Sequence, residues 1–460
     1  MWCTVKARVP KKLEALLNGL TKESARVWNE ARELVLSQID LDYLLSLMNN
    51  KKSREAYTIL NTLKWEAQKI IKSDILHSQT VQAIQDYLTA SIKSYLKNKL
   101  NDDSHNLPKE VKWYSLIWKN QAIKFVDGKI QLSLARGKGK IIVPLKKKHK
   151  KQLSRFLNEF NGVIRWVVIT RKYGCYWMHI FVKAEDAKAD VDIERRLFID
   201  IGEIHPFVGW NDVDNEFVFF NGRHIRSLKQ LRLKLIAKKQ SMLSKRQKGS
   251  GRWRRVKQSF DEQIWKLERK ITDLECKYIK ALLDYCLEHR IGRVVIGDLK
   301  GIRENNDKGN GVNQKIHNVW RFRKLVDRLK YKLSTYGIRV VEVSEEFSTQ
   351  LCPVCGESNK PNGRIYKCKC GFIFHRDFVG AIGIARNFYN FELKRGFKWL
   401  APEKICVEVF KVDIDKAEVK SIVVCLRPRS WNGTPAVRCS SPFGARNPHF
   451  SAGSVMCVMT

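Results

Sequence analysis

The chain has 460 residues and a formal net charge of +39 at pH 7, from 86 Lys and Arg against 47 Asp and Glu. A positive excess this large repels itself, so we expect a polyanionic partner such as nucleic acid. Hydrophobic residues make up 44 % of the chain, which excludes a purely disordered basic protein and allows several folded domains. No apolar segment fits a signal peptide or a membrane span, so we expect no membrane contact and reduced cysteines.

The first part of the chain changes from helical to strand-like patterning. Leu13, Leu16, Leu17 and Leu20 recur at helical spacing, and residues 12–100 continue in this way. Short alternating segments then predict strands over residues 111–182. We expect a helical lobe with the first barrel strand over residues 1–110, and a β-barrel that contacts a phosphate backbone over residues 111–190. A charge run is more often a solvated loop than a specific site, but one run there is a candidate nucleic-acid-binding surface: Lys146, Lys147, Lys148 and Lys150.

Residues 191–346 alternate between strands and helices, which predicts an α/β sheet with parallel strands. The expected strands and helices are residues 197–202, 216–220, 294–298, 321–336 and 339–343, with a helical hairpin at 223–290. Ligands in such sheets gather at the carboxyl ends of the strands, where Asp200, Asp298 and Glu345 fall.

The helical hairpin has one apolar face, and its other face is crowded with Lys and Arg. Two packed surface helices would explain the periodicity alone. The density of cations beside the turn favours an arm that contacts a nucleic-acid backbone, and its candidate residues are Arg252, Arg254, Arg255 and Lys257.

Four cysteines form two close pairs, Cys352-x-x-Cys355 and Cys368-x-Cys370. Four thiolates at this spacing are typical of a structural, tetrahedral Zn²⁺ site, which holds a loop that is too short to fold alone. We therefore predict a zinc finger over residues 347–372. The remaining eight cysteines are not paired in this way, and we interpret them as packing residues.

Two aspartates lie at positions where a charged side chain costs folding free energy or has a function. Asp200 ends an apolar strand, where a charge needs a cleft or a cation. Asp377 opens a helical segment just after the finger, a position that an ordinary helix cap would also explain. A nuclease of the RNase H type needs such carboxylates to hold two catalytic Mg²⁺ ions.

The motifs together resemble the TnpB family. In order they are Phe198-Ile-Asp-Ile-Gly202, Val294-Val-Ile-Gly-Asp-Leu299, the two cysteine pairs, and His375-Arg-Asp-x-x-Gly-Ala381. TnpB proteins are transposon-encoded, RNA-guided DNA endonucleases, related to compact type V CRISPR effectors and to Fanzor proteins. The resemblance implies a RuvC-type nuclease, a guide RNA, a double-stranded DNA target and a monomeric ribonucleoprotein. It also implies a cytoplasmic, nucleoid-associated location in a prokaryote.

Carried over by motif, Asp200 is the first catalytic carboxylate and Asp377 the third. The second is uncertain in position, because Gly297 replaces the glutamate that most of the family has there. The nuclease is either inactivated or uses a relocated glutamate, as one branch of TnpB and the Fanzor proteins do. We favour relocation to Glu345, which shares a strand face with Val341 and Val343, and Glu346 and Asp298 remain alternatives.

The expected fold is a multidomain α/β chain, with an RNase H-like RuvC nuclease core, an inserted zinc finger, and a preceding helical lobe and β-barrel. The last nuclease motif and its helix occupy residues 373–395, and residues 396–460 are expected to form a basic, disordered tail. Three functions follow: an RNA-guided nuclease, a guided DNA-binding protein with an inactive nuclease, or a zinc-finger nucleic-acid-binding protein without a guide.

Overall fold

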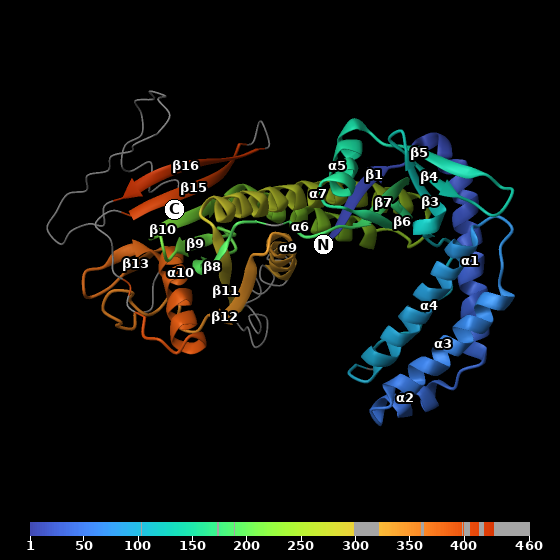
Figure 1. The fold of residues 1–460 in the computed structure, drawn as a ribbon, viewed down its shortest axis with the longest axis horizontal. Coiled ribbons are helices and arrows are strands. Elements are labelled where there is room, and N and C mark those ends of the chain that lie inside the picture. Colours follow the sequence, from blue (N-terminus) through green and yellow to red (C-terminus); the bar gives the residue numbers. More distant parts are fainter. Residues whose placement is uncertain are drawn as a thin grey trace. The chain divides into compact units, whose positions relative to one another are not determined.

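The computed structural model divides into two compact units, Met1–Asp186 and Ala187–Thr460 (Figure 1). It describes residues 1–102, 104–172, 174–187, 189–298, 322–359, 363–397, 399, 405–413 and 418–426. Within these residues, no helix combines the length and the apolar character that crossing a membrane requires.

The first unit contains the predicted helical lobe. A strand, β1 (Trp2–Arg8), and a 3-10 turn, η1 (Lys11–Leu13), precede it. Its helices are α1 (Glu14–Ser37), α2 (Leu41–Asn49), α3 (Ser53–Ile70) and α4 (Ser78–Lys99). In α1, Leu17 and Leu20 are buried while Leu16 is exposed, so the leucine periodicity selects the face that packs.

Two antiparallel sheets complete this unit. The larger has the order β1-β7-β6-β2, and the smaller has the order β3-β4-β5. Their strands are β2 (Leu116–Lys119), β3 (Ile123–Val126), β4 (Lys129–Ser133), β5 (Lys140–Pro144), β6 (Val163–Lys172) and β7 (Cys175–Lys183), with a 3-10 turn η2 (Asn120–Ala122). The helices and both sheets share one hydrophobic core.

The lysine run differs from its predicted setting among barrel strands and loops. It begins helix α5 (Lys147–Asn158), with Lys146 as the preceding cap residue. The unbranched side chains of Lys are good helix formers, and Leu153 anchors the helix because it is fully buried. The lysines therefore lie on a helix that follows β5.

A mixed seven-stranded sheet forms the centre of the second unit, in the order β12-β11-β8-β9-β10-β15-β16. Its strands are β8 (Asp192–Asp200), β9 (Val208–Asn211), β10 (Glu216–Asn221), β11 (Ile291–Asp298), β12 (Arg339–Ser344), β15 (Ile405–Asp413) and β16 (Glu418–Leu426). Strand β11 pairs in parallel with both β8 and β12, so their carboxyl ends meet at one edge, as predicted. The short strand β9 was not predicted.

Helices cover both faces of this sheet. Helices α6 (Arg223–Ser244), α7 (Gly251–Glu288) and α9 (Phe322–Ser334) pack on one face around Val294 and Ile296. Helix α10 (Arg376–Asn387) and its π-helical extension η4 (Phe388–Glu392) pack on the other around Phe198 and Val295. We call these the α7 face and the α10 face.

The predicted basic hairpin is α6 and α7, which lie side by side in Figure 1. Ion pairs Arg232–Glu268 at 2.7 Å and Lys239–Asp261 at 2.5 Å connect them. The later residue of α6 meets the earlier residue of α7, which fixes an antiparallel arrangement.

The prediction of a disordered tail from residue 396 is wrong for two segments. Strand β15 pairs in parallel with β10, and β16 pairs antiparallel with β15, so residues 405–413 and 418–426 extend the central sheet. Val407 and Val409 are buried on the α10 face, while Phe410 and Val412 are buried on the α7 face. The sheet therefore supplies the apolar environment that stabilises this hairpin. The remaining tail, residues 427–460, lies outside the described residues.

Candidate active site and metal centre

Strand alternation places three positions on the α10 face at the carboxyl edge of the sheet. Side chains of a strand alternate between faces, and Phe198, Val295 and Val343 all belong to the core under α10. Two residues further along each segment come Asp200, Gly297 and Glu345. The two acids at these positions therefore face α10, and Glu345 shares the face of Val343, as its position in the sequence predicted.

Glu345 fills the space above Gly297. Gly297 pairs with Val343 in the parallel register, so the chain returns beside it just after β12 ends. A Cβ atom at Gly297 would lie 2.0 Å from Oε1 of Glu345, a distance that real atoms do not adopt. Any side chain at residue 297 would thus displace the Glu345 carboxyl group from where it lies.

The Glu345 carboxyl group is buried without compensation. Among the described residues, no hydrogen-bond partner reaches its buried Oε1 atom. Burial, with a smaller contribution from Asp298, raises the pKa of Glu345 from 4.5 to about 7. A buried acid in this condition is either protonated or next to a cation.

Asp377 comes to the same place from helix α10, where it is buried. The helix can approach closely because Gly380 has no side chain: a Cβ there would lie 2.4 Å from Oδ2 of Asp200. Arg364, just before β13, donates to both carboxylate oxygens of Asp377 at 3.2 Å. A divalent cation bound by Asp377 would therefore share this carboxylate with Arg364.

The acids affect one another electrostatically. Removal of water from the Asp200 carboxyl group raises its pKa well above 3.8, and the charges of Asp377 and Glu345 raise it further. The nearby guanidinium groups of Arg376 and Arg364 act in the opposite direction but do not cancel the increase. The three acids thus form one electrostatic cluster, which is suited to divalent cations.

The two alternative acids are placed differently. Asp298 alternates with Val294 and Ile296, whose side chains pack on the α7 face, so its register directs it to that face. Glu346 is exposed, and its backbone carbonyl accepts a hydrogen bond from the side chain of Asn387 at 2.9 Å. Of the three candidates, Glu345 alone is on the α10 face with its carboxyl group buried.

Two buried histidines lie beside Asp377. Possible ligand atoms of His205, His375 and Asp377 lie within 4.8 Å of one another. However, Nδ1 of His375 accepts a hydrogen bond from the Asp377 backbone N–H at 3.3 Å, so a neutral ring carries its proton on Nε2 and has no free lone pair for a metal. Burial lowers the pKa of His205 to about 4, so this histidine is neutral. His375 therefore caps the start of α10 through its hydrogen bond with the Asp377 backbone N–H.

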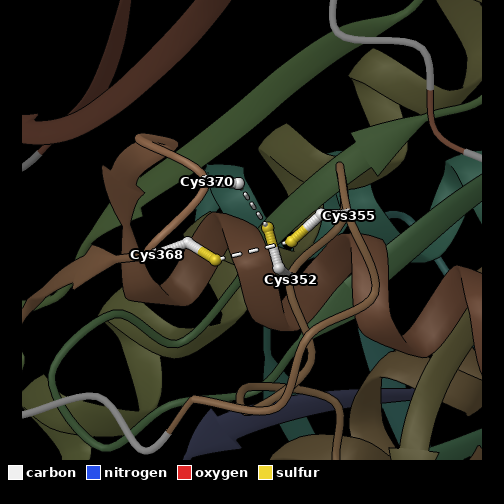
Figure 2. Close-up of side chains that lie close together, drawn as sticks. All are labelled: Cys352, Cys355, Cys368 and Cys370. Carbon is white, nitrogen blue, oxygen red and sulfur yellow. Dashed lines mark hydrogen bonds between the residues drawn. The ribbon is translucent and has the colours of Figure 1, made fainter.

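The four predicted cysteine ligands come together (Figure 2). All four Sγ atoms lie within 4.8 Å of one another, with Cys352–Cys370 at 3.7 Å and Cys355–Cys368 at 3.5 Å. Tetrahedral Zn²⁺ with Zn–S bonds of about 2.3 Å separates its sulfur atoms by about 3.8 Å. The cluster therefore has the dimensions of a zinc site.

A small hairpin holds the second cysteine pair. Strand β13 (Ile365–Lys367) pairs with β14 (Ile373–His375), and Cys368 and Cys370 lie in the connecting turn. The hairpin leads directly into α10. The cysteine cluster consequently fixes the segment that carries Asp377.

The predicted nucleic-acid-binding residues are all exposed. Lys146, Lys147, Lys148 and Lys150 lie at the start of α5 in the first unit. Arg252, Arg254, Arg255 and Lys257 lie in the first turns of α7 in the second unit. Lys257 forms an ion pair with Asp261 at 3.3 Å.

Three residues at the site were not predicted from the sequence: Gly380, Arg364 and His205. Gly380 was visible in the motif after Asp377, where a glycine inside a helix signals a close approach. No local pattern marks Arg364 or His205, because each reaches Asp377 through tertiary packing.

A family model described as "Cas12f1-like, TNB domain" matches residues 322–384. The TnpB-like protein MJ0751 of Methanocaldococcus jannaschii is 27 % identical over 43 % of this chain and 70 % of its own length. The CRISPR-associated endodeoxyribonuclease Cas12f1 of Sulfoacidibacillus thermotolerans is 21 % identical over 82 % of this chain and 93 % of its own length.

A solved structure of Cas12f1 with sgRNA and target DNA matches the fold with a TM-score of 0.58 and 13 % identity. The match covers 82 % of this chain and 83 % of that one, so the two chains share a fold. The sequence relatives and the family model support a relationship of this chain to TnpB proteins and compact type V effectors.

Proposed function

We propose that this chain is an RNA-guided DNA endonuclease whose RuvC-type site consists of Asp200, Glu345 and Asp377. The relatives support this reaction, since Cas12f1 is an endodeoxyribonuclease and its solved complex contains guide RNA and target DNA. The net charge of +39 supports binding of two polyanions. The similarity to TnpB-like proteins favours coding by a mobile element and a single chain bound to its guide.

The main support for the proposal is that residue 297 is a glycine and that the carboxyl group of Glu345 fills the space beside it. An inactivated nuclease would have lost the acid at residue 297 without replacement. Here the space beside Gly297 holds the carboxyl group of Glu345, the residue that follows β12, and its buried Oε1 atom has no hydrogen-bond partner among the described residues. Retaining such a group is costly unless a cation compensates it. We therefore assign this chain to the branch with a relocated second glutamate.

The donor atoms fit the expected metals. Carboxylate oxygens of Asp200, Glu345 and Asp377 would hold Mg²⁺, a hard cation that prefers oxygen, and the four thiolates would hold structural Zn²⁺. When bound, paired Mg²⁺ ions supply an activated water and stabilise the leaving oxygen of the phosphodiester. Gly380 and Gly297 provide the close packing that brings the acids together, and Arg364 holds Asp377 in place.

The exposed cations on α5 and at the start of α7 would contact phosphates of the guide RNA and the double-stranded DNA target. These contacts are independent of base sequence and depend on salt. They therefore provide affinity, whereas pairing between guide and target provides specificity.

The test combines cleavage with binding. The chain is co-expressed with its flanking DNA, purified as a ribonucleoprotein, and assayed on a target library with randomised flanks, with and without Mg²⁺. We expect Mg²⁺-dependent cuts beside one enriched motif, loss of cutting in Glu345→Ala, and unchanged guide and target binding in that variant. Glu346→Ala and Asp298→Asn are the matched controls and should still cut.

Unchanged cleavage by Glu345→Ala would reject the assigned glutamate. Tight target binding by the wild-type chain without any cuts would mean that the nuclease is inactive. Binding that needs no co-purified RNA would favour a zinc-finger protein without a guide.

A further inference from the structure

The larger sheet of the first unit has one face that does not contribute to the core. On the inner face, Val5, Ile180 and Val167 pair across β1, β7 and β6 and are fully buried. Alternate residues point to the other side, where Thr4, Phe181 and Trp166 form the next row. This outer face is rich in aromatic side chains.

Two tryptophans on this face form an exposed stack. The rings of Trp2 on β1 and Trp166 on β6 lie 5.0 Å apart with an interplanar angle of 12°, although β7 separates their strands. Their exposed fractions are 41 % and 39 %. The nearly parallel rings of His179 and Phe181 on β7 continue the aromatic surface. Exposed aromatic patches of this kind mark interaction surfaces.

A β-bulge brings Trp166 to this face. Ile164 pairs with Val182 on the inner side, and Trp166, two residues later, would face inward in a regular strand. The register shifts between Ile164 and Trp166, so Trp166 lies opposite Phe181 on the outer side. A bulge reorients a side chain but interrupts the regular strand pairing. We therefore infer that the exposed position of Trp166 serves a function.

The charge of the sheet is uniformly positive. Every residue of β1, β2, β6 and β7 is described, and none is Asp or Glu. Cations lie among the outer aromatic residues, and Lys6 Nζ lies 5.1 Å from the ring centroid of Trp177. The outer-face cations are Lys6, Arg8, Lys119, Lys172 and Lys183, of which Lys119 is paired with Asp86 of α4 at 2.8 Å. Flat aromatic rings between cations complement nucleobases joined by phosphates.

We propose that this face, the tryptophan face (Trp2, Lys6, Arg8, Trp166, His179 and Phe181), stacks unpaired nucleobases of the guide RNA. The inference rests on the proposed function, which supplies the RNA. Bases within a duplex are already stacked on each other, whereas loops and single-stranded ends of RNA offer free base faces to aromatic side chains. Lys6 and Arg8 contact the phosphates of the same segment.

The test measures the affinity of the full chain for a short unstructured RNA oligonucleotide. A second oligonucleotide of equal length has the same sugar–phosphate backbone but no bases. Elevated salt weakens the phosphate contacts made elsewhere on the chain. We expect Trp166→Ala to weaken binding of the base-bearing RNA by about tenfold and Trp2→Ala by a similar factor, which is the usual size of one lost base stack. Trp166→Phe should retain most of the affinity, and none of these variants should change binding of the abasic strand.

Trp65 on α3 is the matched control. It is more exposed, at 59 %, and has Lys64 Nζ 4.7 Å from its ring centroid, but it lies outside the sheet. Trp65→Ala should bind as the wild type does. Equal losses in Trp65→Ala and Trp166→Ala, or no loss in Trp166→Ala, would overturn the proposal. A larger tryptophan-dependent effect on single-stranded DNA than on RNA would overturn the choice of RNA.

The experiment is independent of the nuclease site. Asp200→Asn should bind the RNA oligonucleotide as the wild type does, because no acid of the cluster belongs to the first unit. Failure of the wild-type ribonucleoprotein to cut DNA would therefore reject the proposed function without any change in these affinities.

Discussion

Buried carboxyl groups on the two faces of the central sheet differ in their cationic partners. On the α7 face, Glu275 is 7 % exposed and has two cationic partners, Lys229 at 2.9 Å and Arg328 at 2.7 Å. On the α10 face, Asp200 and Glu345 have raised pKa values, and Oε1 of Glu345 is without a hydrogen-bond partner among the described residues. The charge of Glu275 is therefore balanced within the fold, and Asp377 has Arg364 as a partner, whereas the buried Oε1 atom of Glu345 has no such partner among the described residues.

Exchanging one acid on each face for its amide gives the strongest test of this difference. Glu345→Gln should lower DNA cleavage by about 10⁴-fold, the order found when a single member of a catalytic group is removed. Glu275→Gln should leave cleavage nearly unchanged and destabilise the fold by about 3 kcal/mol, because it breaks a buried ion pair. Single-turnover cleavage and chemical denaturation measure the two effects. If the two variants lost equal cleavage activity and equal stability, the proposed difference between the two faces would be wrong.

The space above Gly297 provides a second test. Gly297→Ala places a methyl group against the Glu345 carboxyl group, so we expect a decrease in cleavage of about 100-fold from a displaced ligand. Gly251→Ala is the control, since nothing lies within 4 Å of that position. The double variant Gly297→Glu with Glu345→Ala should recover part of the activity, because the acid returns to the same face. Full activity of Gly297→Ala would contradict the geometry.

The cysteine cluster tests whether the α10 face depends on the finger that precedes it. Cys370→Ser should lose the bound zinc, measured by elemental analysis, and should cut DNA about tenfold more slowly because α10 and Asp377 are held less firmly. Cys276→Ser, an exposed cysteine on α7, is the control. Zinc content that is the same in both variants would exclude the four-cysteine site.

The smallest expected effect is the pH dependence of stability in Mg²⁺-free buffer. Because the pKa of Glu345 is raised from 4.5 to about 7, the folded chain binds more protons than the unfolded chain between these values. The stability gained from this proton is complete below pH 4.5 and is lost as the pH rises through about 7. The shift corresponds to roughly 3 kcal/mol. Thermal unfolding of the wild type and Glu345→Gln should diverge over this range, and parallel pH profiles would show that Glu345 is not buried as described.

Residue patterns alone predicted many of the helices and strands and the cysteine cluster. The spacing of the cysteines predicted a cluster that the fold assembles, and apolar periodicity predicted the helical lobe, the hairpin α6–α7 and the strands β8, β11 and β12. Both signals are local, because a cysteine pair or a strand face is defined within a few residues. The tail was misjudged for the opposite reason: β15 is stable only because β10 lies beside it.

The sequence by itself determined that acids end neighbouring strands and that residue 297 lacks one. It could not decide among Glu345, Glu346 and Asp298, since all three lie near the same edge. The tertiary structure shows how the three are placed, because the parallel register of β11 and β12 brings Glu345 over Gly297 and directs Asp298 to the opposite face, and our choice of Glu345 is a proposal that rests on this placement. Only packing between segments that are distant in sequence can place a carboxyl group in the space that a missing side chain leaves.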